Sequence, residues 1–259
     1  MTTIIAIANE KGGVAKTTTA LSLGGAFVES KREVLVVDLD PQANLALALG
    51  VKPAAIRKSS ADLLLRNAPL SSVSRETALP GLDLVPAHAE LARAEEILPQ
   101  IAGYATTLRS ALNGDLYYDY VILDCPPSLG AITLNALTAA DLLIIPTQAE
   151  YFSSHALRDM LGFVRMVREE HNPGLTYRIL ITMLDRRNRI HRLIQNQLEA
   201  TFPGSLCKTV IQVDTRLRES PVVGLPITYF SADTRGAEQY RALSKEVAEY
   251  VFQPAPQPA

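Results

Sequence analysis

The chain has 259 residues, of which 47% are hydrophobic and 20% charged, and its formal net charge is −2. This balance fits one large α/β domain with a sizeable core, and it excludes a global positive field that would attract nucleic acid. Two cysteines cannot build a disulfide framework and are compatible with a reducing compartment. The sequence shows no apolar run of membrane-spanning length and no signal peptide, so we expect a cytoplasmic protein.

Six short apolar runs, rich in β-branched residues, are predicted as strands. They occupy residues 3–8, 33–39, 82–87, 119–126, 141–147 and 177–184. Helical patterns lie between them, for example at 17–29, 130–140 and 154–170, and we expect residues 50–80 to be mostly helical. Continuous apolar runs indicate strands that are buried on both faces, and their alternation with helices predicts a doubly wound, mostly parallel sheet. We expect a single domain over residues 1–252 and a disordered, Pro-rich tail over 253–259.

The segment "NEKGGVAKTTTA" (residues 9–20) follows the first predicted strand and leads into a helix that we expect to start near Thr17. Gly12 and Gly13 permit a tight turn, and the N–H groups of residues 13–18 can form an anion-binding nest at the helix N-terminus. Lys16 would then reach the β- and γ-phosphates of a nucleotide, and the Thr17 hydroxyl would bind Mg²⁺. The alternative is a plain Gly-Gly turn with solvated lysines.

Three aspartates follow predicted strands at the sheet edge where ligands bind in open α/β folds. Asp124 ends the run 119–124 and precedes Cys-Pro-Pro, which suits a carboxylate that holds Mg²⁺ through water. Asp38 and Asp40 lie in "DLDPQ" after the second strand, where one can support the metal and the other can position an attacking water. Taken alone, Asp124 is better explained as a helix cap or turn residue, and the metal interpretation is favoured only together with the glycine-rich loop. For Asp38 and Asp40 the alternative is an Asp-Pro turn at a strand end, and their position beside the loop favours the functional interpretation.

Four segments together resemble the ParA family of partitioning ATPases, which belongs to a P-loop group that also contains MinD. These segments are "KGGVAKTTTA", "VLVVDLDPQANLALALGV", "YDYVILDCPPSLGAITLNALTAAD" and "SADTRGAEQYRALSKEVAEY". The likeness runs from residue 2 to about residue 252 in the same order. It implies an Mg²⁺-dependent ATPase that forms an ATP-sandwich homodimer.

The resemblance also assigns roles to single residues. Lys11 is the family's signature lysine and would contact the phosphates bound by the partner subunit, whereas Lys16 would serve its own nucleotide. Asp40 would be the hydrolytic aspartate, with Asp38 as a supporting carboxylate, and Thr17 and Asp124 would form the Mg²⁺ side. The full set expected to bind the nucleotide is Lys11, Gly12, Gly13, Val14, Ala15, Lys16, Thr17, Thr18, Gln212 and Asp214.

The chain departs from the family pattern at four positions. Ala15 replaces a glycine; its methyl group is tolerated if φ is helical and costs about 1 kcal/mol or more if φ is positive. Glu10 replaces a frequent glutamine. In "KTVIQVDTRLRESP", Gln212 replaces a proline and Asp214 replaces the asparagine that meets adenine. A carboxylate can still accept a hydrogen bond from the adenine amino group.

Residues 178–218 contain eight basic and three acidic residues, in a chain whose total charge is −2. This local excess of positive charge is explained at least as well by a solvent-exposed basic face as by a nucleic-acid-binding surface. In ParA proteins, however, arginines of the two corresponding loops bind DNA without sequence preference. Arg187 and Arg216 match those positions best, and Arg186 and Arg189 flank the first of them.

The sequence therefore predicts an ATP-switched, nucleoid-associated protein that moves or positions a chromosome, a plasmid or a protein assembly. A ParB-like or cargo-adaptor protein would stimulate its ATPase. A MinD-like membrane switch is the alternative, but the chain ends in "EVAEYVFQPAPQPA", without the basic amphipathic helix of that class, so we expect no membrane binding. An iron–sulfur reductase of the same superfamily is disfavoured because Cys125 and Cys207 are far apart in the sequence.

Overall fold

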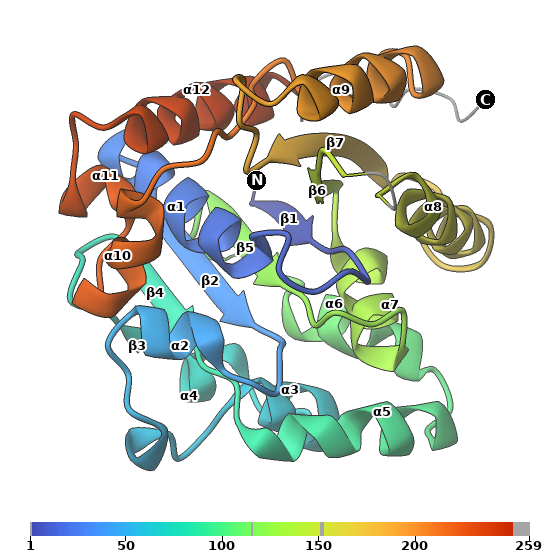
Figure 1. The fold of residues 1–259 in the computed structure, drawn as a ribbon. Helices are drawn as coiled ribbons and strands as arrows, with labels where there is room; N and C mark the ends of the chain where they lie inside the picture. Colours follow the sequence, from blue (N-terminus) through green and yellow to red (C-terminus); the bar gives the residue numbers. More distant parts are fainter. Residues whose placement is uncertain (1, 115, 151–152, 251–259) are drawn as a thin grey trace.

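A central seven-stranded sheet organises the computed structural model, which describes residues 2–114, 116–150 and 153–250 (Figure 1). The strand order is β3-β4-β2-β5-β1-β6-β7, and all neighbours are parallel except β3, which is antiparallel to β4. The strands are β1 (Thr3–Ile7), β2 (Val34–Asp38), β3 (Arg75–Glu76), β4 (Leu82–Val85), β5 (Tyr120–Asp124), β6 (Leu142–Gln148) and β7 (Thr176–Thr182). The chain thus has the expected doubly wound α/β fold of P-loop proteins.

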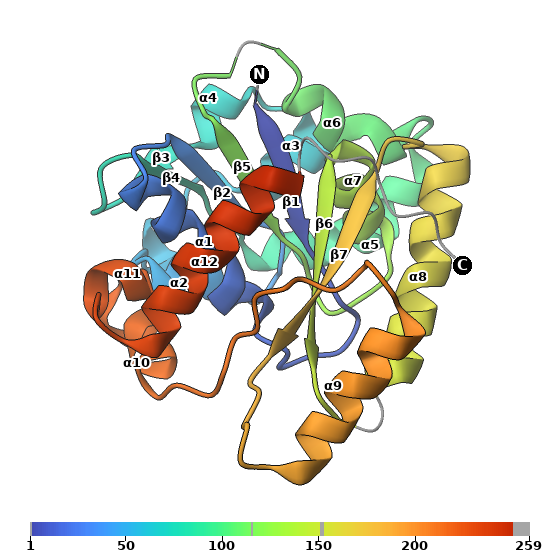
Figure 2. The ribbon, with the colours of Figure 1, turned by 90° about the horizontal axis from the view of Figure 1, so that it is seen from above.

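Helices cover both faces of the sheet (Figures 1 and 2). One layer contains α1 (Lys16–Glu29), α10 (Arg216–Val223), α11 (Ile227–Phe230) and α12 (Arg235–Tyr250). The opposite layer contains α3 (Ser60–Arg66), α5 (Ala94–Ile97), α6 (Thr107–Ala111), α7 (Ala131–Ala139) and α8 (Ser153–Glu170). Shorter pieces are α2 (Asn44–Ala48), α4 (Leu70–Val73) and 3₁₀ turns at Pro53–Ala55, Ala89–Arg93, Leu98–Gln100 and Tyr104–Thr106, while α9 (Arg189–Thr201) lies beyond the β7 edge. Among the described residues, no helix combines the length and apolar character needed to cross a membrane.

The six predicted strands and the three predicted helices are all present, with ends that differ by a few residues. The expectation for residues 50–80 was only partly right. This region holds two short α-helices and one 3₁₀ turn separated by irregular backbone, and it ends in β3, a strand of two exposed residues. Such a strand carries no buried apolar pattern, so the sequence gives no signal for it. The expected tail, 253–259, lies outside the described residues.

Helix α1 is the element that ties the loop at residues 9–15 to the rest of the core. It packs on the sheet and against α11 and α12, and the Phe27 ring stacks on Tyr120 of β5 with centroids 3.8 Å apart. Gly25 of α1 faces Pro226, at the start of α11. A Cβ at position 25 would lie 2.3 Å from the Pro226 Cβ, which is far inside van der Waals contact. The close approach of α1 to α11 therefore requires glycine here.

Gly25→Ala should destabilise the protein by about 1–3 kcal/mol, because the added methyl group overpacks a rigid contact. Gly162→Ala is the matched control, since a Cβ on this α8 glycine meets nothing within 4 Å. It should leave stability unchanged or raise it by about 0.5–1 kcal/mol. Urea unfolding of both variants measures the difference. Equal stability of the two variants would contradict the packing described for α1 and α11.

Candidate active site

The loops that follow β1, β2, β5 and β7 meet at the carboxyl edge of the sheet around a cavity of about 620 Å³. A cavity of this size suits a nucleotide. Its lining is Gly12, Gly13, Ala15, Lys16, Thr17, Thr18, Leu21, Asp40, Gln42, Asn44, Leu47, Ala48, Pro127, Met183, Pro221 and Val222. The four segments that the sequence placed at this edge are therefore brought together, and α2 and α10 complete the wall.

The loop before α1 turns through two left-handed residues, Gly13 (φ +73°) and Ala15 (φ +69°). The methyl group of Ala15 thus stands at a positive φ, which is the conformation that disfavours alanine. Helix α1 starts at Lys16, one residue before the predicted start. The Lys16 side chain is buried, and its Nζ donates to the carbonyl oxygens of Asn9 (3.0 Å) and Lys11 (3.1 Å). This amino group therefore closes the loop on itself.

Two buried carboxylates lie side by side because β2 and β5 are in register, with Asp38 opposite Asp124. Burial raises the pKa of Asp124 well above its usual range, and the neighbouring Asp38 raises it further, while Thr17 and Lys16 act in the opposite direction. Burial likewise lowers the pKa of Lys16, and Asp124 opposes that shift most strongly among the charged neighbours. Burial thus disfavours the charged forms of these groups, and a cation held beside the carboxylates would favour their ionised state.

The donor set fits Mg²⁺. Within the described residues, neither carboxylate oxygen of the buried Asp124 makes a hydrogen bond of normal geometry, which is costly unless an ion or water is held there. In the described ranges, no three His, Cys, Asp or Glu side chains lie close enough together to hold a metal ion by themselves. Magnesium does not need such a group, because it takes one or two protein oxygens and completes its coordination shell with phosphate and water oxygens. Thr17, which lines the cavity and faces Asp124, would supply the hydroxyl ligand.

Asp38 and Asp40 differ in what they contact. Both oxygens of Asp38 accept backbone N–H groups, from Asp40 (3.1 Å) and Ala46 (3.0 Å), so this carboxylate anchors the loop after β2. Burial raises the pKa of Asp38 to about 7, against the effect of these hydrogen bonds. Asp40 lines the cavity, and its Oδ1 accepts the N–H of Gln42 at 2.9 Å. The geometry favours Asp40 as the carboxylate that faces a substrate.

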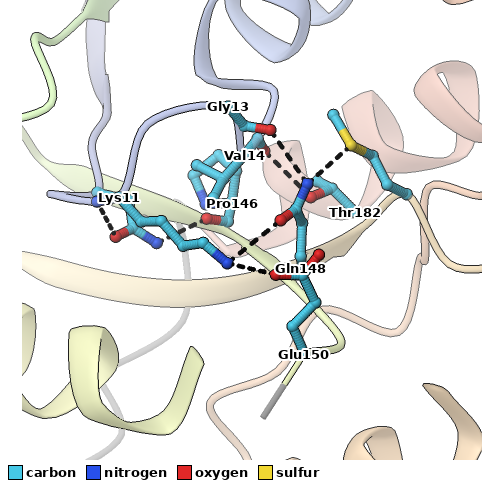
Figure 3. Close-up of polar contacts among 9 residues, drawn as sticks. Lys11, Gly13, Val14, Pro146, Gln148, Glu150 and Thr182 are labelled. Carbon is cyan, nitrogen blue, oxygen red and sulfur yellow. Dashed lines mark hydrogen bonds and ion pairs between the residues drawn. The ribbon is translucent and has the colours of Figure 1, made fainter. Parts of the chain in front are cut away.

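Lys11 is not among the residues that line this cavity. Its Nζ lies 2.6 Å from Oε2 of Glu150 and 3.3 Å from Oε1 of Gln148 (Figure 3). Gln148 is the last residue of β6, and Glu150 lies just beyond the end of this strand. The two lysines of the loop therefore have separate surroundings within one chain. Lys16 lines the cavity, and Lys11 is directed to the β6 end.

A smaller cavity of about 50 Å³ adjoins the first one and shares Ala15, Thr18 and Met183 with it. The predicted base-contact residues Gln212 and Asp214 line it. The carboxylate of Asp214 accepts the N–H groups of Arg216 (3.0 Å) and Gly236 (2.9 Å), so it also fixes the starts of α10 and α12. Gln212 and Asp214 thus line a small cavity beside the larger one, with both Asp214 oxygens already engaged by backbone groups.

The arginines predicted to contact DNA are exposed. Arg186, Arg187 and Arg189 precede or begin α9, and Arg216 begins α10. Arg187 pairs with Asp185 (3.2 Å) and Arg216 with Glu219 (2.7 Å), so part of their charge is neutralised within the chain. Arg178, which contributed to the basic tally of the sequence, is buried under the Tyr250 ring at 4.2 Å from its centroid. The exposed patch is therefore less basic than the sequence count suggested.

The structure adds residues that the sequence motifs did not single out. Gln148 and Thr182 contact the carbonyl groups of the loop at residues 9–15, and Asn9 donates from Nδ2 to the carbonyl oxygen of Pro146 (2.8 Å) (Figure 3). Met183 lines both cavities at a positive φ of 53°. The signal for Gln148, Thr182 and Met183 was their position at the carboxyl ends of predicted strands.

Comparison with known proteins agrees with this geometry. Residues 2–177 match the family model described as AAA domain. The chain is 40% identical over 247 residues to the sporulation initiation inhibitor protein Soj of Bacillus subtilis, covering 95% of this chain and 98% of Soj. It is 38% identical over 250 residues to the chromosome partitioning protein ParA of Caulobacter vibrioides, covering 94% and 93%.

A solved structure from Mycobacterium smegmatis, named cobyrinic acid a,c-diamide synthase and containing an ATP analogue and magnesium, superposes with a TM-score of 0.85. The two chains are 33% identical, and each is covered completely. The match to Soj and ParA spans nearly the whole of each protein. This chain belongs to the ParA/Soj family of partitioning ATPases.

Proposed function

We propose that this chain is an ATP-dependent dimeric switch that binds DNA without sequence preference and positions a chromosome, a plasmid or a protein assembly. The observation that carries the proposal is the separation of its two loop lysines. Lys16 lines a nucleotide-sized cavity together with Asp40, whereas Lys11 is held outside that cavity. A lysine whose amino group is directed away from the cavity of its own chain is available for the nucleotide of a second subunit.

ATP with Mg²⁺ is the ligand that this site suits. The N–H groups of residues 13–18 and Lys16 would hold the phosphates, Thr17 and Asp124 would hold the ion, and residues 212–214 would contact the base. When bound, Mg²⁺ neutralises phosphate charge and polarises the terminal phosphate. Asp40 would orient the attacking water for hydrolysis to ADP and phosphate, and Asp38 would keep the Asp40 loop in place.

DNA binding is proposed for the exposed Arg186, Arg187, Arg189 and Arg216. Their ion pairs with Asp185 and Glu219 lie at the surface, where such pairs contribute about 1 kcal/mol or less, so DNA phosphates can replace them. A dimer doubles the number of these arginines along one duplex. Because the net charge of the chain is −2, a monomer has little else to hold DNA, and binding should depend on ATP.

The partitioning role follows from the similarity to Soj and ParA, whose identities of 40% and 38% exceed the 33% to the synthase-named structure. A ParB-like or cargo-adaptor protein would stimulate hydrolysis and release the dimer from the nucleoid.

One observation favours a second candidate, a MinD-like membrane switch. Helix α9 exposes Ile190 (62%) and Leu193 (58%) beside Arg189 and Arg192, as an interfacial helix does.

Replacing Asp40 should separate nucleotide binding from hydrolysis. We expect both Asp40→Ala and Asp40→Asn to bind ATP and dimerise but to lower turnover by roughly 100-fold or more, as for loss of a water-positioning base. Asparagine retains an acceptor for the Gln42 N–H, so its loss of turnover would come from the missing charge rather than from a disordered loop. Phosphate release and light scattering measure both effects. Full turnover in either variant would assign the role to another residue, first to Asp38.

Replacing Arg216 should weaken binding to all DNA sequences alike. On unrelated duplexes with ATP, the wild type should bind with an affinity that falls steeply with salt, by about 0.9 log units per log unit of salt for each phosphate contact. Arg216→Ala should reduce that slope by about one for each phosphate that this arginine neutralises. The control is Arg75→Ala, which removes the same charge from exposed β3 at the far edge of the sheet.

The same titration separates the two candidate functions. With ADP, DNA binding should be lost while nucleotide binding persists. If the wild-type ATP dimer fails to bind DNA even at low salt, or sediments with anionic liposomes instead, the DNA-based role is wrong and the membrane switch replaces it.

A further inference from the structure

Two side chains from the ends of neighbouring strands hold consecutive carbonyl groups of the loop that precedes α1 (Figure 3). Nε2 of Gln148, the last residue of β6, donates to the carbonyl oxygen of Gly13 at 3.1 Å. Oγ1 of Thr182, the last residue of β7, donates to the carbonyl oxygen of Val14, also at 3.1 Å. Thr182 is completely buried, so the second hydrogen bond is shielded from water.

These hydrogen bonds fix the direction of the N–H groups on the same peptide units. The described residues contain no cis peptide bond, and in a planar trans peptide the N–H points opposite to the C=O. The N–H groups of Val14 and Ala15 are therefore directed away from Gln148 and Thr182. Among the described residues, neither N–H donates to a protein acceptor, and both belong to the stretch proposed to form the anion nest.

Position 15 explains why such support is needed. A glycine adopts a positive φ freely, but here Ala15 stands at +69°, a conformation that an L-residue with a Cβ disfavours. The Thr182 hydrogen bond acts on the peptide unit between Val14 and Ala15, so it opposes rotation of Ala15 out of the left-handed region. Gly13, also left-handed, needs no such restraint, and its anchor Gln148 has more exposed surroundings.

We propose that Thr182, with Gln148 in a lesser part, is a positioning residue that directs the Ala15 and Val14 N–H groups at the phosphates of the bound nucleotide and stabilises a loop that lacks the usual glycine. The inference rests on the proposed assignment of this loop to phosphate binding. It gives a function to two strand-end residues that do not line the larger cavity, of which Thr182 also lines the smaller one.

The test is the affinity for MgADP, measured by calorimetry. Thr182→Val keeps the shape of the side chain and removes only the hydroxyl group, so it should weaken binding about fivefold, as for one lost hydrogen bond. Thr182→Ser keeps the hydroxyl group and should bind within about twofold of the wild type. Thermal unfolding without nucleotide checks that both variants fold.

Ala15→Gly provides the readout that a general packing defect would not change. With glycine at position 15, the left-handed conformation no longer needs the same support, so adding Thr182→Val should cost less affinity than it costs in the wild-type chain, about twofold instead of fivefold. A hydroxyl group that served only core packing would give the same loss in both backgrounds, and that result would overturn the proposal.

Lys16→Ala distinguishes this inference from the proposed function on which it rests. If Lys16→Ala binds MgADP as tightly as the wild type, the loop is not the phosphate site, and both proposals fail. If Lys16→Ala loses binding while Thr182→Val retains full affinity, the phosphate site stands, and the positioning role of Thr182 is wrong.

Discussion

The direction of a few peptide units before α1 is the constraint on which the rest of the site depends. For N–H groups to face an anion, their carbonyl groups must be held on the opposite side, and Lys16, Gln148 and Thr182 provide those contacts. Turning the peptide units in this way is accompanied by residues in the left-handed conformation. Ala15, Ala43 and Met183 all have positive φ, and each lies in a loop after β1, β2 or β7 at the same edge of the sheet. Strain of this kind tends to gather at functional sites, where surrounding contacts maintain it.

Electrostatics impose a second requirement on the same edge. Strand register puts Asp38 opposite Asp124, and burial raises the pKa of both carboxyl groups. Asp38 is stabilised by backbone N–H groups, whereas among the described residues Asp124 makes no hydrogen bond of normal geometry and has the nearby Thr17 hydroxyl group and Lys16 to favour its charged form. The sheet therefore holds a carboxylate whose environment is completed by a cation. Magnesium bound with a nucleotide would supply that cation next to Lys16. This explains why the loop at residues 9–15 and Asp124 lie at the same edge of the sheet.

The strands and long helices could be predicted because their apolar runs are long and continuous, and the carboxyl-end rule placed four loops at one site. Exposed β3 has no such pattern and was missed. From the sequence we could predict the energetic cost of a positive φ at Ala15, but not whether φ is positive. That value depends on contacts with Gln148 and Thr182, which are more than 130 positions away. The charge count likewise included Arg178, and only packing against Tyr250 shows that this side chain is buried.

The central claim is that the two lysines of one loop serve two different nucleotides. Mixing Lys11→Ala with Lys16→Ala tests it most directly, because a mixed dimer has one site with Lys16 from its own subunit and Lys11 from the other. Each variant alone should show no ATPase activity above background, and the equimolar mixture should recover clear activity. If both lysines acted on the nucleotide of their own chain, no mixed site would be complete, and a mixture as inactive as its components would contradict the account.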